Sequence, residues 1–177
     1  MSVQSILEAI AALGDAERRD LLARLREIYG APAPARQISL NLGEWDGPAD
    51  YLIVFDGGSQ GNPGPGYGSH ALFTSGRPGQ VTRTSFPGSL TNNEAEYLTL
   101  QAALRDLTLR LGAQAGSATV EVRGDSSLVI EQVSGRWKAK DARMRQLRDE
   151  VRALLNAFKA ARLVQQPRDD TVRVLGH

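Results

Sequence analysis

The sequence contains no cysteine and only two histidines, His70 and His177. The lack of cysteine excludes disulfides, thiolate nucleophiles and zinc sites built on thiolates. Two histidines also make a multi-histidine metal site a poor candidate. Any metal site in this chain must therefore be built mainly from oxygen ligands.

The chain also lacks a strong charge of either sign and any long hydrophobic run. Its 21 Lys and Arg side chains balance 20 Asp and Glu, so affinity for nucleic acid must come from a local surface. No apolar stretch approaches the roughly 18 residues of a membrane span, and the N-terminus has no signal-peptide pattern. These absences predict a soluble, cytoplasmic protein with no membrane partner.

The 177 residues suit one medium domain with a small appendage. Residues 1–30 are predicted to form a helical extension of two short amphipathic helices, which break at Gly14-Asp15. Residues 31–48, with prolines among alanines, are predicted to be a linker. The extension is interpreted as cover for an exposed face of residues 49–177 rather than as a recognition module, within one chain or across a homodimer.

Residues 49–177 show the pattern of an α/β domain with a mixed five-stranded sheet flanked by helices. Strands are expected at 51–55, 69–74, 80–86, 118–123 and 162–166. Helices are expected at 91–111, 126–134 and 141–160, with Thr91 as an N-cap and Gly112 as the stop.

Two aspartates follow predicted strands directly. Asp56 comes after the apolar run Tyr51 to Phe55, and Asp125 ends a strand in which Val120 and Val122 point the opposite way. A lone aspartate at a strand end is more commonly a turn former or helix cap. Neither residue would therefore indicate a site by itself.

A glutamate on the long helix provides a sharper test. The buried stripe of this helix, Leu100, Leu104 and Leu107, reaches Glu96 when it is extended back by one turn. Glu94 lies about 200° around the helix from Glu96 and is expected to face solvent. An acid on the core side needs a basic partner, a hydrogen-bond network or a metal, and an ion pair with arginine is the plainest alternative.

Two strand ends and one inward-facing glutamate can bring three carboxylates together at one edge of a sheet. Such charges do not all stay ionised without a cation, and Mg²⁺ prefers oxygen ligands, with Mn²⁺ as a second candidate. Divalent ions held in this way can clamp a phosphodiester and activate water. The pattern therefore predicts phosphoryl-transfer chemistry.

Three sequence segments together resemble the type 1 ribonuclease H family, especially its compact bacterial and archaeal branch. They are the glycine-rich segment Asp56 to Gly66, the helix start Thr91 to Tyr97, and Gly124 to Ser126. They occur in the family's order and with its spacing. The resemblance implies the ribonuclease H-like fold, with Asp56, Glu96 and Asp125 as metal-binding catalytic residues.

The same resemblance implies hydrolysis of the RNA strand of RNA-DNA hybrids, which leaves a 3′-hydroxyl and a 5′-phosphate. Substrate contacts would fall in the first loop and at the helix start, on Gly58, Ser59, Asn62, Asn92 and Asn93. Asn92 and Asn93 are equally suited to capping the helix.

The segment 135–140 resembles the short connection of the compact branch, which has no long basic protrusion. Lys138 and Lys140 are predicted to contact substrate, and with Arg136, Arg143 and Arg145 they form either a phosphate-binding patch or an ordinary solvated face. Trp137 is expected to belong to the core.

The C-terminus departs from the family pattern. Members carry an Asn and then an Asp that opens a final helix, whereas Thr171 and Leu175 occupy these positions here. The domain is therefore expected to lack the final helix. Either Asp169 or Asp170 replaces the fourth carboxylate, with Asp170 the tentative catalytic candidate, or the site lacks a ligand and is slow. Both acids are more commonly surface turn residues.

Two further interpretations belong to different functional classes. One is a weakly active or non-catalytic RNA- or hybrid-binding module with the same fold. The other is a dinucleotide site at 66–71, which is rejected because a strand rather than a helix is expected to follow it.

Overall fold

The computed structural model describes residues 9–10, 12–14, 16–17, 20–21, 24, 48–74 and 77–176. The chain divides into two compact units, Met1–Gln37 and Ile38–His177, and the division falls within the segment predicted as a linker. Residues 9–10, 16–17, 20–21 and 24 are helical. Residues 12–14 between them are not helical, and the other residues of the predicted helical extension, most of the linker and His177 lie outside the described residues.

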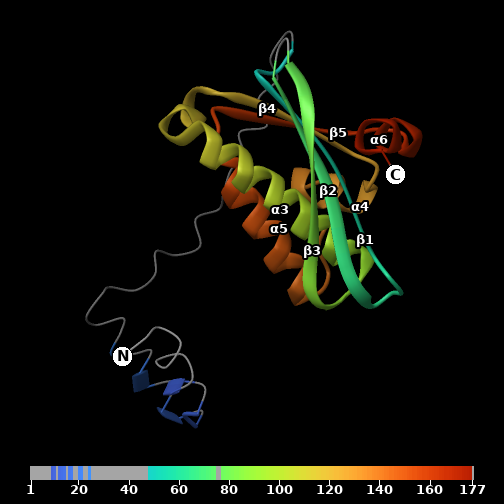
Figure 1. Cartoon of the computed structure of the whole chain (residues 1–177). Helices are drawn as coiled ribbons and strands as arrows, with labels where there is room; N and C mark the ends of the chain where they lie inside the picture. The colour runs from blue at the N-terminus through green and yellow to red at the C-terminus, as the bar shows by residue number, and fades with distance from the viewer. Residues whose placement is uncertain are drawn as a thin grey trace. The chain divides into compact units, whose positions relative to one another are not determined.

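A five-stranded mixed sheet forms the centre of the second unit, in the order β3-β2-β1-β4-β5 (Figure 1). The central strand β1 pairs antiparallel with β2 and parallel with β4. The strands are β1 Tyr51–Ser59, β2 Gly64–Thr74, β3 Arg77–Leu90, β4 Thr119–Gly124 and β5 Ala160–Gln165. The mixed sheet is as predicted, but β1 continues through Asp56 to Ser59 instead of ending at the aspartate.

Helices lie on both faces of this sheet. Figure 1 shows α3 and α5 side by side along one face. The helical segments are α3 Asn92–Leu111, the 3-10 turn η1 Gly112–Ser117, α4 Ser127–Ser134, α5 Ala142–Leu155 and α6 Arg168–Leu175. Among the described residues, no helix is long and apolar enough to cross a membrane.

The helix α6 corrects the expectation that the chain lacks a final helix. Pro167 immediately precedes it, and its fixed φ suits the start of a helix. Thr171 and Leu175, four residues apart, are both buried and give the short helix an inward face. Two such positions are too few for a periodic pattern to stand out in the sequence, which is why the helix was missed.

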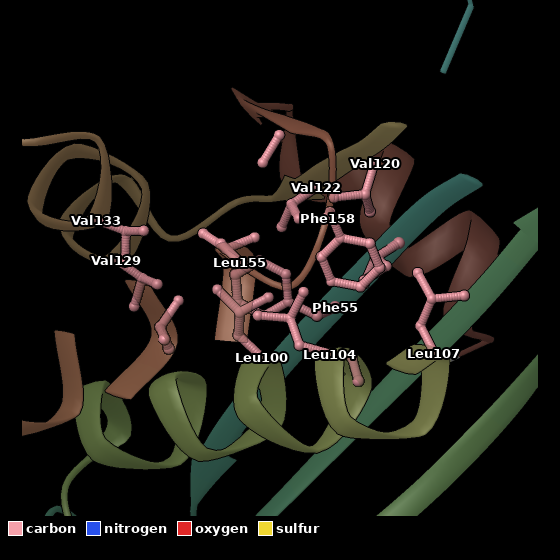
Figure 2. Close-up of a cluster of buried hydrophobic side chains, with 14 of the residues drawn as sticks. Phe55, Leu100, Leu104, Leu107, Val120, Val122, Val129, Val133, Leu155 and Phe158 are labelled. Carbon is pink, nitrogen blue, oxygen red and sulfur yellow. The ribbon is translucent and has the colours of Figure 1, made fainter. Parts of the chain in front are cut away.

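The main hydrophobic core lies between the sheet and the helices α3, α4 and α5 (Figure 2). Phe55 from β1 meets Leu100 and Leu104 from α3, while Val54 points to the opposite face and packs in a second cluster with Ala71 and Leu175. The strand is thus buried on both faces. This accounts for the unbroken apolar run at its start.

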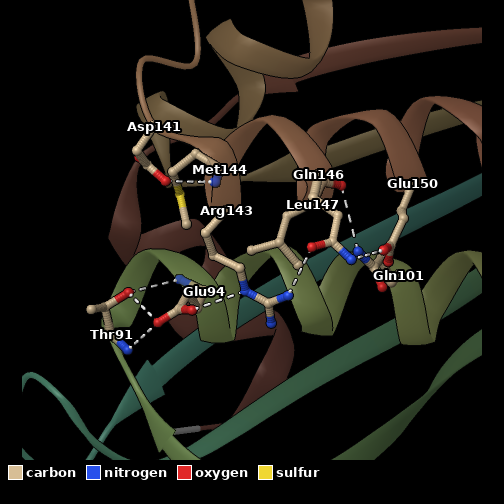
Figure 3. A network of polar contacts seen from close by, with 9 residues as sticks. All are labelled: Thr91, Glu94, Gln101, Asp141, Arg143, Met144, Gln146, Leu147 and Glu150. Atoms are coloured by element: carbon tan, nitrogen blue, oxygen red, sulfur yellow. Dashed lines mark hydrogen bonds and ion pairs between the residues drawn. The ribbon is translucent and has the colours of Figure 1, made fainter. Parts of the chain in front are cut away.

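The N-terminus of α3 is held by a capping box. The Thr91 hydroxyl accepts the backbone N–H of Glu94, and the Glu94 carboxylate accepts the backbone N–H of Thr91. Glu94 also pairs with Arg143 of α5 at 3.1 Å (Figure 3). The expectation that Glu94 simply faces solvent is therefore wrong: it joins two helices and fixes the helix end that carries Glu96.

Candidate metal centre

Parallel pairing brings two aspartates to the same edge of the sheet. Val54 of β1 is in register with Arg123 of β4. Asp56 and Asp125 each lie two residues beyond that pair, so both occupy the same level of two neighbouring strands. The carboxyl end of a parallel strand pair is a common place for a functional site.

Close packing of α3 against β1 brings the third acid to this edge. A Cβ atom on Gly57 would lie 2.6 Å from the carbonyl oxygen of Ala95 and 2.7 Å from the backbone nitrogen of Glu96. Only glycine permits this approach. Asp56 precedes Gly57 in the chain, so the close approach at Gly57 places Glu96 beside Asp56.

The three acids form one compact group. One carboxylate oxygen from each of Asp56, Glu96 and Asp125 lies within 4.8 Å of the others. Asp56 is only 8% exposed, and the other two are partly buried. The geometry brings together the three residues that the sequence singled out.

Glu96 has the most perturbed environment of the three. Burial raises its pKa to about 7, and the negative charges of Asp125 and Asp56 act in the same direction. The Ser126 hydroxyl donates a hydrogen bond to Glu96 Oε2 and opposes this shift. The same hydroxyl accepts the backbone N–H of Val129 as the N-cap of α4, so this helix start also orients the acid.

An arginine reaches the group from α6. Arg168 Nη1 donates to Asp125 Oδ2 at 3.1 Å, while the arginine side chain itself is largely exposed. Neither Arg168 nor Ser126 was given a site role from the sequence. Ser126 follows Asp125 directly, but the contact of Arg168 depends on α6, which the sequence did not reveal.

The C-terminal acids do not join the group. Among the described residues, the acidic group contains neither Asp169 nor Asp170, and Asp170 instead pairs with Arg173 at 3.2 Å. Leu175, which the resemblance puts at the place of the family's fourth acid, is buried in the second hydrophobic cluster. The structure thus does not support the tentative assignment of Asp170.

The glycine-rich loop is tied to the start of α3. The backbone N–H and the hydroxyl of Ser59 both donate to Asn92 Oδ1 at 2.9 Å, and the backbone N–H of Asn92 donates to Asn62 Oδ1. Asn93 lines a pocket that also includes Asn62. The predicted substrate contacts on the loop and the helix therefore lie together.

The basic connection is exposed, and so is its tryptophan. Lys138 and Lys140 are exposed, and Trp137 is 51% exposed, so the expectation that Trp137 belongs to the core is wrong. Arg136 pairs with Glu131 and Arg143 with Glu94. Two arginines of the predicted phosphate-binding patch are thus engaged with acids.

The chemistry of the acidic group suits a hard divalent cation. Burial raises the pKa of Glu96, and the nearby negative charges of Asp125 and Asp56, whose carboxylate oxygens lie within 4.8 Å, add to this effect. A divalent ion would relieve this repulsion, and oxygen is the ligand that Mg²⁺ and Mn²⁺ prefer. Asp56, Glu96 and Asp125 are the residues that would hold it.

Comparison with known proteins places the chain in a family. Residues 56–173 match the model of the family described as "Reverse transcriptase-like". Ribonuclease HI of Halobacterium salinarum is 40% identical over 115 residues, which are 64% of this chain and 55% of that protein. The bifunctional protein Rv2228c of Mycobacterium tuberculosis is 39% identical over 119 residues, which are 66% of this chain but only 31% of that protein.

Solved structures agree with these matches. The crystal structure of the Halobacterium salinarum ribonuclease H1 aligns with a TM-score of 0.62 and 34% identity, over 70% of this chain and 90% of that one. The LC11 ribonuclease H1, solved in complex with an RNA/DNA hybrid, aligns with a TM-score of 0.64 and 28% identity, over 70% and 90% of the two chains. With its fold, its acidic group and these matches, the chain belongs to the type 1 ribonuclease H family.

Proposed function

We propose that this chain is a divalent-metal-dependent endoribonuclease that hydrolyses the RNA strand of RNA-DNA hybrids and leaves a 3′-hydroxyl and a 5′-phosphate. The observation that carries the proposal is the convergence of Asp56, Glu96 and Asp125 within 4.8 Å. Membership of the ribonuclease H family and the hybrid bound to the LC11 relative support an RNA-DNA hybrid as the substrate class.

In this proposal the three acids hold the metal, and a bound Mg²⁺ or Mn²⁺ supplies charge stabilisation of the phosphodiester and activation of water. Ser126 holds the Glu96 carboxylate in place through its hydrogen bond. The loop residues Gly58, Ser59 and Asn62, together with Asn92 and Asn93, contact the RNA backbone and its 2′-hydroxyls. Lys138 and Lys140 bind phosphates of the hybrid.

Arg168 has a dual effect in this proposal. Its ion pair with Asp125 partly neutralises that carboxylate and so competes with a metal for Asp125. Because Arg168 lies at the surface beside the acids, its guanidinium is also placed to attract the phosphodiester.

A second candidate is a hybrid-binding module with little or no turnover. Two features favour it: the resemblance puts Leu175, which is buried in an apolar cluster, at the place of the family's fourth acid, and Arg168 donates a hydrogen bond to Asp125 Oδ2. This candidate predicts tight hybrid binding without cleavage.

Cleavage of an end-labelled RNA-DNA hybrid in Mg²⁺ or Mn²⁺ separates the two candidates. The enzyme proposal expects cleavage that Asp125→Asn reduces by about a hundredfold or more, because metal-assisted charge stabilisation is worth several kcal/mol. Leu109→Ala, at an exposed position of α3, is the matched control and should cleave like the parent chain. Binding without any cleavage by the parent chain would support the module instead.

A further inference from the structure

A pocket of about 380 Å³ adjoins the acidic group on the face of the sheet opposite α3. It is lined by the side chain of Asp56 and by residues of the two neighbouring strands, Tyr67, Ser69, Arg83, Thr84 and Ser85. Its volume lies within the range of about 300–1,000 Å³ typical of small-molecule sites. We call it the β2-β3 pocket.

The strand register places this pocket directly beside Asp56. Asp56 pairs with Ser69, and Ser69 pairs with Arg83, so the three residues form one row across β1, β2 and β3. Directly paired residues of antiparallel strands point to the same face. With strands about 4.8 Å apart, Arg83 lies roughly two strand spacings from Asp56.

Tyr67 and Arg83 give the pocket its chemistry. Tyr67 is 46% exposed, and its hydroxyl lies over Gly58, where an added Cβ would come within 2.8 Å of that oxygen. Arg83 is exposed and donates Nη2 to the carbonyl oxygen of Leu175 at 3.0 Å, which holds its guanidinium at the end of α6. A cation, an exposed ring and serine hydroxyls thus meet beside the acids.

We propose that the β2-β3 pocket binds the ribose-phosphate of a nucleotide adjoining the scissile bond, with Arg83 on its phosphate and the Tyr67 ring against its ribose. The inference rests on the proposed function, because an RNA strand lying across the acids must continue to one side of Asp56. Arginine suits phosphate, and tyrosine offers both an apolar ring and a hydroxyl for a 2′-hydroxyl. Arg83 and Tyr67 are thus substrate-positioning residues.

Hybrid binding can be measured in the full chain carrying Asp125→Asn, so that cleavage does not interfere. Fluorescence anisotropy of a labelled RNA-DNA hybrid is recorded over a range of salt concentrations. Arg83→Gln should weaken binding roughly tenfold, as expected for a lost charge-assisted hydrogen bond, and should reduce the slope of log affinity against log salt by about 1.

Arg83→Lys keeps the charge and should restore the salt slope, whereas Leu109→Ala should change neither quantity. The salt slope matters because Arg83→Gln also removes the bond to Leu175 and can lower the melting temperature. A purely structural arginine would lower stability without changing the number of neutralised phosphates.

A second measurement locates the phosphate. A set of hybrids is prepared in which one neutral methylphosphonate replaces a different phosphate of the RNA strand in each. The affinity for each hybrid is measured for the Asp125→Asn chain with and without Arg83→Gln. At one phosphate beside the scissile bond, the two losses should be non-additive, because each removes the same contact. Tyr67→Ala should weaken binding severalfold, and Tyr67→Phe should weaken it less. The parent chain and Tyr67→Phe should bind equally well when the nucleotide located by the phosphate scan lacks its 2′-hydroxyl.

The outcomes separate this inference from the function on which it rests. If the parent chain binds the hybrid but Arg83→Gln leaves affinity and salt slope unchanged, the pocket assignment alone is overturned. Additive losses at every phosphate of the scan would also overturn it. If the parent chain neither binds nor cleaves the hybrid, the pocket assignment and the proposed function are overturned together.

Discussion

Glu96 shows how a single side chain can be chosen from sequence and then explained by structure. The leucine stripe of α3 selected it over Glu94, and the structure places it beside Asp56 and Asp125. The face of a helix on which a residue lies can be read from sequence because helical periodicity depends only on local geometry. The pairing of Glu94 with Arg143 could not be predicted from periodicity, because Arg143 lies 49 residues away on another helix.

The raised pKa of Glu96 predicts an unusual pH dependence of stability. The pKa of Glu96 is about 7 in the folded chain, whereas its ordinary value is 4.5. Between these pH values the folded chain keeps a proton on Glu96 that the unfolded chain has released. Its contribution to stability is therefore complete below pH 4.5 and is lost as pH rises to about 7.

Urea denaturation of the metal-free chain measures this effect. The free energy of unfolding of the parent chain, relative to that of Glu96→Gln, should fall as pH rises from 4.5 to 7, because the variant has no proton to lose. Mg²⁺ should raise the stability of the parent chain at pH 8 by binding the ionised acids. A parent-minus-variant difference that is constant with pH would contradict the assigned pKa.

Ser126 predicts a coupling between a helix cap and the acidic group. Ser126→Ala should destabilise the chain by about 1 kcal/mol through loss of the α4 N-cap. It should also shift the pH at which Glu96 ionises upward, because the hydroxyl bond lowers the pKa of that acid. Ser126→Thr, which can keep both bonds, is the matched control. Chemical denaturation measures the loss of stability, and the pH profile of cleavage measures the ionisation of Glu96. An unchanged pH profile would show that the helix cap and Glu96 are not coupled.

The contact between α3 and β1 depends on one glycine. Gly57→Ala would force Cβ into the Ala95 carbonyl and the Glu96 nitrogen, so the helix must move away. We expect a loss of about 2–3 kcal/mol from overpacking and a large drop in hybrid cleavage, because Glu96 moves with the helix. Gly116→Ala is the control, since an added Cβ there meets nothing within 4 Å. Cleavage by Gly57→Ala at the parental rate would show that this packing does not position Glu96.

The packing of α6 indicates that an acid placed at position 175 would not complete the acidic group. Leu175 packs on Val54 and Ala71, so Leu175→Ala should cost about 3 kcal/mol. Leu175→Asp should destabilise the chain further, because it buries a charge in an apolar cluster, and should not raise the cleavage rate. Melting curves and hybrid cleavage test both variants. A faster Leu175→Asp chain would show that the carboxylate reaches the metal-binding acids.

The sequence predicted most of these helices and strands but not all of their ends. The strand β1 was expected to stop at Asp56, yet it pairs with β2 as far as Ser59, because Gly57 and Gly58 accept the extended backbone between close neighbours. The helix α5 stops at Leu155, five residues short of its expected end, since the chain must turn before β5 begins at Ala160. Both ends are set by tertiary pairing, which local patterns do not contain.

At the scale of the entire chain, the family and the mixed sheet could be predicted from sequence. Three motifs and the order of predicted strands and helices indicated the same fold. The role of residues 1–37 stays a prediction. The hypothesis that the first helices cover the domain predicts that a chain starting at Ile38 melts at a lower temperature than the full chain. An unchanged melting temperature would count against that hypothesis, and sedimentation of both chains would test the predicted homodimer.

We expect Asp56, Glu96 and Asp125 to hold a divalent ion together. Titration of Mn²⁺ into the full chain, followed by the electron paramagnetic resonance signal of free Mn²⁺, tests it without relying on cleavage. Mn²⁺ binding should strengthen from pH 6 to pH 8 as Glu96 ionises, and Asp56→Asn should weaken it by about tenfold or more. Equal Mn²⁺ binding by the parent chain and by Asp56→Asn at pH 8 would contradict it.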